Sequence, residues 1–380
     1  GEVKQYVAID DRDIYNVSNI SFTKVKNQNI KGTVFKNNQN QFQDVDYIII
    51  ATPQYLSEAN RLAMLHTQHS NYNVKVIELQ DIYNEFSSGQ RDIAAIRNFM
   101  RYVYFNASTP DKRVKYLNLF GDTSFDYKDI IPNNNNIIPT FHYLANITPS
   151  GSGSSANFSN YSTYMSDDFF VLMDDNEGSM QNNFQQGLDI AVGRILFSTP
   201  AQAKQMVDKI HKYYDKSSYG RWRNNIILLG DDIDAPSDLF LQSDLDAIAQ
   251  NIENNRPFIN IKKIYMDAYT QTVSAGGNRY VDAKSDFINS FDAGSLVVNY
   301  YGHGGERLLA SERIFELSDV GKLQNNHKLP VFITITCEVS RFDNPYLLSL
   351  GESVFLNPEA GAIALLTTTR EIGISNGRDI

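Results

Sequence analysis

Hydrophobic residues recur along the chain in short runs, and segments with helical spacing separate these runs. Between residues 45 and 221, four apolar runs predict strands and three amphipathic segments predict helices. The predicted strands are residues 47–51, 74–79, 116–120 and 188–195, and the predicted helices are residues 56–69, 93–104 and 201–214. Strands that alternate with helices in this way are typical of a parallel sheet with helices on its faces.

A second series of apolar runs follows a polar connector at residues 215–221. The predicted strands of this series are residues 226–230, 261–266, 296–301, 331–336 and 362–368. We therefore expect an α/β protein with two parallel-sheet subdomains and flanking helices. The first subdomain is predicted over residues 45–221 and the second over residues 222–380.

Two regions of the chain do not follow this alternation. Residues 1–44 show no helical period, and we expect irregular chain or short edge strands that end a preceding β-rich region. Residues 131–164 are rich in Asn, Ser and Gly, a composition that predicts a long loop.

Composition narrows the class of protein. Of the 380 residues, 42% are hydrophobic and the mean hydropathy is -0.36, and no stretch approaches the roughly 18 apolar residues of a membrane span. The net charge is -10, and the 34 basic residues are scattered among 44 acidic ones. This balance argues against a nucleic-acid partner.

The chain has one cysteine, Cys337, which directly follows the predicted strand 331–336. His303 lies two residues beyond the end of the predicted strand 296–301. Loops converge at the carboxyl ends of the strands in an open parallel sheet, so we expect the thiol and the imidazole to face one cleft. An imidazole beside a thiol favours the reactive thiolate, and the pair predicts a cysteine nucleophile with its base.

Other interpretations of the cysteine remain open at this stage. A lone cysteine is commonly a buried small hydrophobic residue. Zinc binding is a poor alternative, because one cysteine and scattered histidines provide no ligand spacing. His66 and His69, at positions i and i+3, are better explained as residues on a helix face.

Backbone and acidic groups near the two strand ends complete the predicted site. The amides of Gly304 and Cys337 are candidate donors to an oxyanion. Asp231 and Asp232 follow the predicted strand 226–230 and are candidates to hold the imidazole through its second nitrogen. Either aspartate could instead cap a helix or be a carboxylate of a loop.

Further charged residues flank the site or cluster elsewhere. Glu306, Glu338 and Arg341 are predicted to contact substrate or to support the loops, although each taken alone is typical of a solvated surface. No cofactor is required for the predicted chemistry. The acidic pairs 167–168 and 174–175 offer oxygen ligands for a structural Ca²⁺ ion but lack the spacing of an EF-hand.

Several motifs together resemble the gingipain-type cysteine peptidases, which are caspase-like α/β enzymes. The resemblance spans residues 47–380. The motifs are residues 81–86, 119–122, 191–194, 299–304, 336–338, 342–343, 351–352 and 361–364. The resemblance implies Cys337 as nucleophile, His303 as base and Asp231 or Asp232 as the acidic helper. Family members that cut after basic residues carry an acidic residue in the specificity pocket, and here the matching stretch offers Asp238 and Asp244.

Within that family, three motifs look most like the sortases of the type IX secretion system. They are residues 121–127, 166–170 and 336–343. The implied activity is removal of a C-terminal signal domain from exported cargo, with transfer of the acyl group to a lipopolysaccharide amine. The implied location is the bacterial cell surface, in association with the outer membrane and other secretion-system proteins. The alternatives are a secreted gingipain-like protease and a non-catalytic binding or assembly module on the cell surface.

Overall fold

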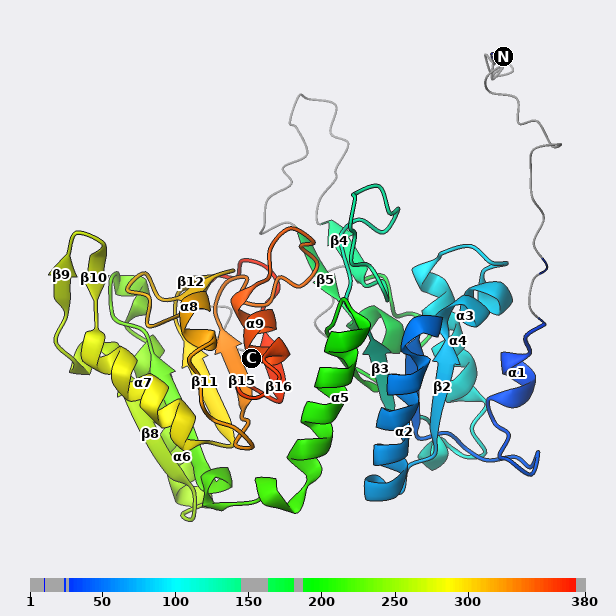
Figure 1. The fold of residues 1–380 in the computed structure, drawn as a ribbon, viewed down its shortest axis with the longest axis horizontal. Coiled ribbons are helices and arrows are strands. Elements are labelled where there is room, and N and C mark those ends of the chain that lie inside the picture. The colour runs from blue at the N-terminus through cyan, green and yellow to red at the C-terminus, as the bar shows by residue number, and fades with distance from the viewer. Residues whose placement is uncertain (1–9, 11–23, 25–26, 145–162, 181–186, 374–380) are drawn as a thin grey trace.

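The structure, a computed structural model, contains two parallel β-sheets that lie side by side with helix α5 between them (Figure 1). It describes residues 10, 24, 27–144, 163–180 and 187–373. None of the helices in these ranges combines the length and apolar character needed to cross a membrane. The arrangement confirms the predicted α/β class with two parallel-sheet subdomains and flanking helices.

The first sheet has the strand order β2-β1-β3-β6, and all its neighbouring strands are parallel. Ile48 and Ile50 of β1 pack with helices α3 and α4 on one face, whereas Ile49 and Ala51 pack with α2 and α5 on the other. This alternation follows the two-residue period of a strand that is buried on both faces. The strands are β1 (Tyr47–Ala51), β2 (Val74–Glu78), β3 (Tyr116–Phe120) and β6 (Ala191–Ile195). The helices are α2 (Leu56–Ser70), α3 (Leu79–Phe86), α4 (Ile93–Phe105) and α5 (Pro200–Tyr214).

The second sheet has the order β16-β15-β11-β7-β8, again with parallel neighbours. Phe287 and Phe291 of helix α7 pack in one core cluster with Phe332 of β15, while Leu245 of helix α6 packs against Leu228 on the opposite face. The strands are β7 (Asn225–Gly230), β8 (Asn260–Tyr265), β11 (Val297–Tyr301), β15 (Val331–Ile335) and β16 (Ala364–Thr367). The helices are α6 (Leu241–Asn255), α7 (Val281–Ala293), α8 (Leu317–Val320) and α9 (Leu350–Leu356).

Short antiparallel sheets complete the described fold. One of them lies in the region predicted as a loop over residues 131–164, where residues 141–144 (β4) pair with residues 163–166 (β5), and residues 145–162 between them lie outside the described residues. Aromatic packing favours the pairing, because the ring centroids of Tyr143 and Tyr164 are 4.9 Å apart. These short strands are β4 (Phe141–Leu144), β5 (Thr163–Ser166), β9 (Thr272–Ser274), β10 (Gly277–Arg279), β12 (Gly304–Gly305), β13 (Leu308–Leu309) and β14 (Phe315–Glu316).

The N-terminal region also differs from expectation where it is described. Residues Ile30–Thr33 form the short helix α1, and the side chain of Asn29 caps it by accepting a 2.9 Å hydrogen bond from the amide of Gly32. Val34 and Phe35 are buried in the core of the first sheet. Most of residues 1–26 lie outside the described residues, and the boundaries of the predicted domains stay a prediction.

A buried lysine ties helix α5 to the second subdomain. Lys209 is 2% exposed, and its ammonium donates hydrogen bonds to the carbonyls of Phe355 and Asn357 at the end of α9, at 2.8 and 2.7 Å. Burial lowers the pKa of Lys209 to about 7. The last carbonyls of a helix have no hydrogen-bond partner within it, so those at the end of α9 are available to Lys209. Their partial negative charge offsets the cost of burying the ammonium group.

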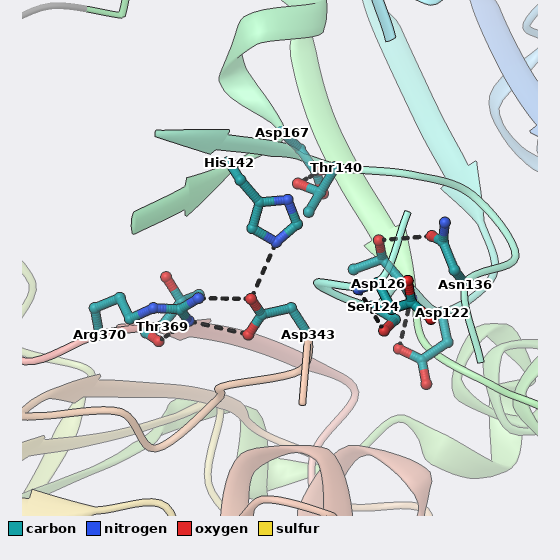
Figure 2. Close-up of polar contacts among 11 residues, drawn as sticks. Asp122, Ser124, Asp126, Asn136, Thr140, His142, Asp167, Asp343, Thr369 and Arg370 are labelled. Carbon is teal, nitrogen blue, oxygen red and sulfur yellow. Dashed lines mark hydrogen bonds and ion pairs between the residues drawn. The ribbon is translucent and has the colours of Figure 1, made fainter. Parts of the chain in front are cut away.

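A buried ion-pair cluster joins the two subdomains at Asp343, in the loop between β15 and α9 (Figure 2). Arg370 contacts both carboxylate oxygens of Asp343, at 3.0 and 2.5 Å, and His142 of β4 contacts Oδ2 at 3.0 Å. The amide of Phe125, which follows β3, donates to the carbonyl of Asp343 at 2.9 Å. Segments from both sheets therefore meet at one residue.

The environment of Asp343 strongly favours its charged form. Burial alone would raise its pKa, but hydrogen bonds from His142 and Arg370 outweigh burial and lower the pKa to about 2. The charged carboxylate therefore contributes stability above the unfolded value of 3.8, and this contribution disappears as the pH falls through about 2. A shift of this size corresponds to about 2 kcal/mol.

We expect the substitution Asp343→Asn to lower the free energy of unfolding by about 3 kcal/mol at neutral pH, because it leaves the Arg370 guanidinium buried without its counter-charge. The deficit should shrink between about pH 4 and pH 2, where the wild-type carboxylate takes up a proton. Urea unfolding across this range measures the difference, with the exposed Asp111→Asn as control. A deficit that stays constant at every pH would contradict the assigned role of the charge.

Candidate active site

The candidate nucleophile and base lie on the same edge of the second sheet. Tyr301 is the register partner of Ile335, and His303 and Cys337 each follow two residues later. The amide of Gly302 still donates to the carbonyl of Ile335 at 3.3 Å. The two loops remain adjacent as they leave neighbouring strands.

Two glycines allow this close approach. A β-carbon on Gly304 would lie 2.6 Å from Oγ1 of Thr336, the residue before Cys337. A β-carbon on Gly302 would collide with the side chain of Asp231 and lie 2.7 Å from the hydroxyl of Tyr300. Larger residues would therefore push the His303 turn away from the cysteine loop.

Buried polar groups hold the backbone of the His303 turn. Asp231 directly follows β7, and its Oδ2 accepts a 2.7 Å hydrogen bond from the amide of His303. The hydroxyl of Tyr300 donates to the His303 carbonyl. The imidazole itself is half exposed, with 50% of the side chain accessible. The backbone of the turn is fixed while the ring remains available to a ligand.

A carboxylate outside the predicted helper positions contacts the ring. Nε2 of His303 lies 3.4 Å from Oδ1 of Asp238, which ends the 3₁₀ turn Pro236–Asp238 before helix α6. Asp238 is 1% exposed and also accepts hydrogen bonds from the amide of Ala235 and the hydroxyl of Ser237, at 2.8 and 3.0 Å. Burial alone would raise the pKa of Asp238, but these hydrogen bonds and His303 together lower it.

Asp231 and Asp232, the residues predicted to hold the imidazole, make other contacts in this structure. Asp231 binds the His303 backbone instead, and Asp232 accepts a 3.0 Å hydrogen bond from the hydroxyl of Tyr280. Gly230, the last residue of β7, pairs with Tyr301, so the carboxylate that follows it lies beside the backbone of the turn. Burial, opposed by the His303 amide, raises the pKa of Asp231 to about 8.

The Cys337 thiol is half-buried beneath the chain that follows β16. Its sulfur donates to the carbonyl of Ile372 at 3.6 Å, and the amide of Glu338 donates to the carbonyl of Arg370 at 3.3 Å. Burial raises the pKa of the thiol. Within the described residues, no hydrogen bond joins this sulfur to the His303 ring. Catalytic hydrogen bonds are often long in the absence of substrate and tighten when it binds.

Glu306 and Glu338, which are predicted to contact substrate, form ion pairs with an arginine. Arg341 bridges Glu306 and Glu338, at 3.0 Å to each, so these carboxylates link the histidine loop to the cysteine loop. Asp244 lies in the first turn of helix α6, where the helix dipole favours a negative charge.

The proposed oxyanion donors follow the same two strands. Gly304 begins β12, which pairs with β13, and Cys337 directly follows Thr336 beyond β15. Their amides are carried by the two loops that meet at the sheet edge. Their role toward an oxyanion stays a prediction.

One member of each acidic pair considered for calcium forms an ion pair with an arginine. Asp167 forms an ion pair with Arg194 at 2.8 Å, and Asp175 with Arg101 at 2.5 Å. Among the described residues, three carboxylates lie close enough together to share a metal ion, with ligand oxygens within 4.8 Å of one another. They belong to Asp231, Asp232 and Glu312.

Two contacts near the His303 turn have little or no signal in the sequence. Asp238 is a candidate for the specificity pocket by resemblance, and its contact with His303 has no signal beyond a carboxylate between a strand end and the next helix. Glu312 had no signal, because its position beside Asp231 depends on how residues 304–316 fold over the sheet edge.

Comparisons with known proteins identify the family. A sequence model of peptidase family C25 matches residues 40–380. The crystal structure of the Arg specific cysteine proteinase gingipain R has a TM-score of 0.61 at 18% identity, covering 88% of this chain and 66% of that chain. The complex of Porphyromonas gingivalis RgpB pro- and mature domains gives 0.61 at 17% identity, with the same coverage. At these identities the likeness shows the fold.

One further match is partial. The structure of dimeric latent PorU from Porphyromonas gingivalis is 29% identical but covers 48% of this chain and 17% of that chain, with a TM-score of 0.38. No curated protein matches the chain. The chain spans about two thirds of the length of the gingipain R chain. Because the family model extends over most of the sequence, the chain belongs to peptidase family C25, the gingipain family of cysteine peptidases.

Proposed function

We propose that this protein cleaves peptide bonds through a thioester formed on Cys337, with His303 as the base. The observation that carries this proposal is the parallel register of β11 and β15, in which Tyr301 faces Ile335. That register brings the loops of a thiol and a half-exposed imidazole to one edge of the sheet. Membership in a cysteine peptidase family supports the same chemistry.

The proposed reaction begins with transfer of the Cys337 proton to His303. The thiolate attacks the scissile carbonyl, and the resulting oxyanion accepts hydrogen bonds from the amides of Gly304 and Cys337. Collapse of this intermediate breaks the C–N bond, and the leaving amine takes the proton from His303. An acyl thioester remains on the enzyme until water or an amine attacks it.

Asp238 is the proposed positioning residue for the imidazole. Its Oδ1 lies 3.4 Å from Nε2 of His303, and a charged carboxylate there favours the ring orientation that leaves the other nitrogen for the thiol. The raised pKa of the Cys337 thiol makes this assistance important, because burial works against the thiolate.

We further propose that an amine, rather than water, accepts the acyl group, as in a sortase of the type IX secretion system. The support is the set of motifs at residues 121–127, 166–170 and 336–343. In this proposal the substrates are exported proteins with a C-terminal signal domain, and the acceptor is a lipopolysaccharide amine. The proposed place of action is the outer membrane surface, together with other secretion-system proteins.

Two alternatives remain distinct in their chemistry. A secreted gingipain-like protease would use the same thioester but release it with water. A non-catalytic binding module would keep Cys337 as a structural thiol, and the hydrogen bond from the sulfur to the Ile372 carbonyl favours that alternative.

A peptide with a thiol-reactive electrophile should add its mass to wild-type Cys337. We expect no label on Cys337→Ala, and labelling about a hundredfold slower on His303→Ala, because general base assistance contributes at least that factor. Intact-mass spectrometry over time measures both rates.

His327→Ala serves as the matched histidine control, because this residue lies between α8 and β15. Equal labelling of the wild type and His303→Ala would contradict the proposed base. No labelling of the folded wild type would favour the structural-thiol alternative.

The substitution Asp238→Asn should slow the same labelling about tenfold, because a hydrogen bond to a charged group contributes about 1.5 kcal/mol. The effect should disappear in the His303→Ala background, where no ring remains to be oriented. The exposed Asp234→Asn, in the same loop, controls for the loss of one negative charge. An undiminished effect without His303 would show that Asp238 acts on the fold instead.

If the acceptor is an amine, adding a primary amine to a peptide cleavage reaction should convert part of the product from acid to amide, without changing the cleavage site. The two products differ in mass, so mass spectrometry measures what fraction of the thioester reacts with the amine and what fraction reacts with water. A reaction that yields only the acid at every amine concentration, together with broad cleavage of unfolded casein, would favour the secreted protease.

A further inference from the structure

A pocket with a volume of about 710 Å³ lies at the carboxyl edge of the first sheet. Its lining includes Thr52 after β1, Gln80 after β2, Asn136 after β3 and Ser198 after β6. As far as the structure describes the chain, none of the candidate catalytic residues contributes to the lining. The volume is within the range of about 300 to 1,000 Å³ that is typical of small-molecule sites.

The strand order places this pocket at a switch point of the sheet. From β1 the chain passes outward to β2 and then returns to β3 on the opposite side of β1. Helix α2, which follows β1, packs on one face of the sheet, whereas Phe170 and Val171, which follow β3, pack on the other face. Segments that leave two neighbouring strands toward opposite faces diverge, and the crevice between them is where open α/β sheets bind ligands.

Two buried carboxylates order the loop after β3, which forms one wall of the pocket (Figure 2). Oδ2 of Asp126 accepts hydrogen bonds from the amides of residues 130 and 131, at 2.6 Å each. Oδ2 of Asp122 accepts a 2.6 Å hydrogen bond from the side-chain amide of Asn135 and a 2.9 Å hydrogen bond from the hydroxyl of Ser198. A wall that is held in this way loses little conformational freedom when a ligand binds.

The lining combines polar side chains with aromatic and aliphatic surface. Its polar and aromatic groups include the amides of Gln54 and Asn136, the carboxylates of Glu78 and Asp129, the guanidinium of Arg91 and the ring of Tyr127. Among the described residues, one guanidinium therefore lies with two carboxylates, a charge balance that argues against a phosphate or another strongly anionic ligand. Polar groups throughout the lining argue against a lipid chain, which could not satisfy them.

We propose that this pocket binds a neutral carbohydrate. Sugar hydroxyls both donate and accept hydrogen bonds, and the amides and carboxylates of the lining supply both kinds of partner. The apolar C–H face of a sugar ring packs on an aromatic ring such as that of Tyr127, which is 59% exposed. A carbohydrate thus matches both parts of the lining without introducing a charge.

This inference goes beyond the proposed peptidase function. The lining belongs to segments that follow the strands of the first sheet, whereas Cys337 and His303 follow strands of the second. Carbohydrate binding by Cys337→Ala should therefore equal that of the wild type. This result would support the pocket whatever the labelling experiments give.

An array of immobilised glycans, probed with the full chain, tests the ligand class. We expect the protein to bind neutral glycans in preference to sulfated or sialylated ones, because the two carboxylates of the lining repel anions. Calorimetric titration with the free oligosaccharide of the strongest signal then gives the Kd.

Two substitutions locate the site. Tyr127→Ala should raise the Kd about tenfold, because it removes apolar surface that the sugar ring covers. Tyr219→Ala is the matched control, since this tyrosine is 54% exposed and lies outside the pocket lining. Gln54→Ala should raise the Kd about fivefold through the loss of a hydrogen bond, with the exposed Gln39→Ala as its control.

Three results would overturn the carbohydrate site. One is failure of the folded wild type to bind any neutral glycan on the array. Another is binding that Tyr127→Ala and Gln54→Ala both leave unchanged, which would place the glycan elsewhere on the protein. A third is stronger binding of sulfated or sialylated glycans than of neutral ones.

Discussion

The parallel register between β11 and β15 is the constraint on which the candidate site depends. Tyr301 faces Ile335, and His303 and Cys337 leave the sheet at the same level. Val298 and Phe332, which are register partners, are fully buried and hold this alignment. A slip of one residue would turn their side chains to the other face of the sheet, so the hydrophobic core and the placement of the site are specified together.

Beyond the strand ends, two glycines and a buried aspartate shape the loops that carry His303 and Cys337. Gly302 and Gly304 let the two loops approach closely, and Asp231 accepts a hydrogen bond from the amide of His303. The same burial raises the pKa of Asp231 and of the Cys337 thiol. Packing that orders the loops therefore opposes the charged form of the nucleophile, and this gives His303 a necessary role in the proposed chemistry.

The cysteine loop is positioned by both subdomains. Asp343, six residues after Cys337, is held by His142 from the first subdomain and by Arg370 from the chain after β16 (Figure 2). Lys209 of α5 adds a second buried tie at the end of α9. Buried charges of this kind are costly when unpaired, so they favour one relative placement of the two sheets. Segments of both sheets' surroundings therefore contact the chain between Cys337 and the end of α9.

The sequence by itself determined the central strands, their two series and the common edge of His303 and Cys337, because hydrophobic periodicity records burial and parallel strands end together. Tertiary structure decided the side-chain contacts. Asp238 reaches the ring from a 3₁₀ turn eight residues beyond β7, and Glu312 joins Asp231 across a gap of 81 residues. The paths of such loops follow from packing and hydrogen bonding between distant segments, and no local pattern encodes those distances.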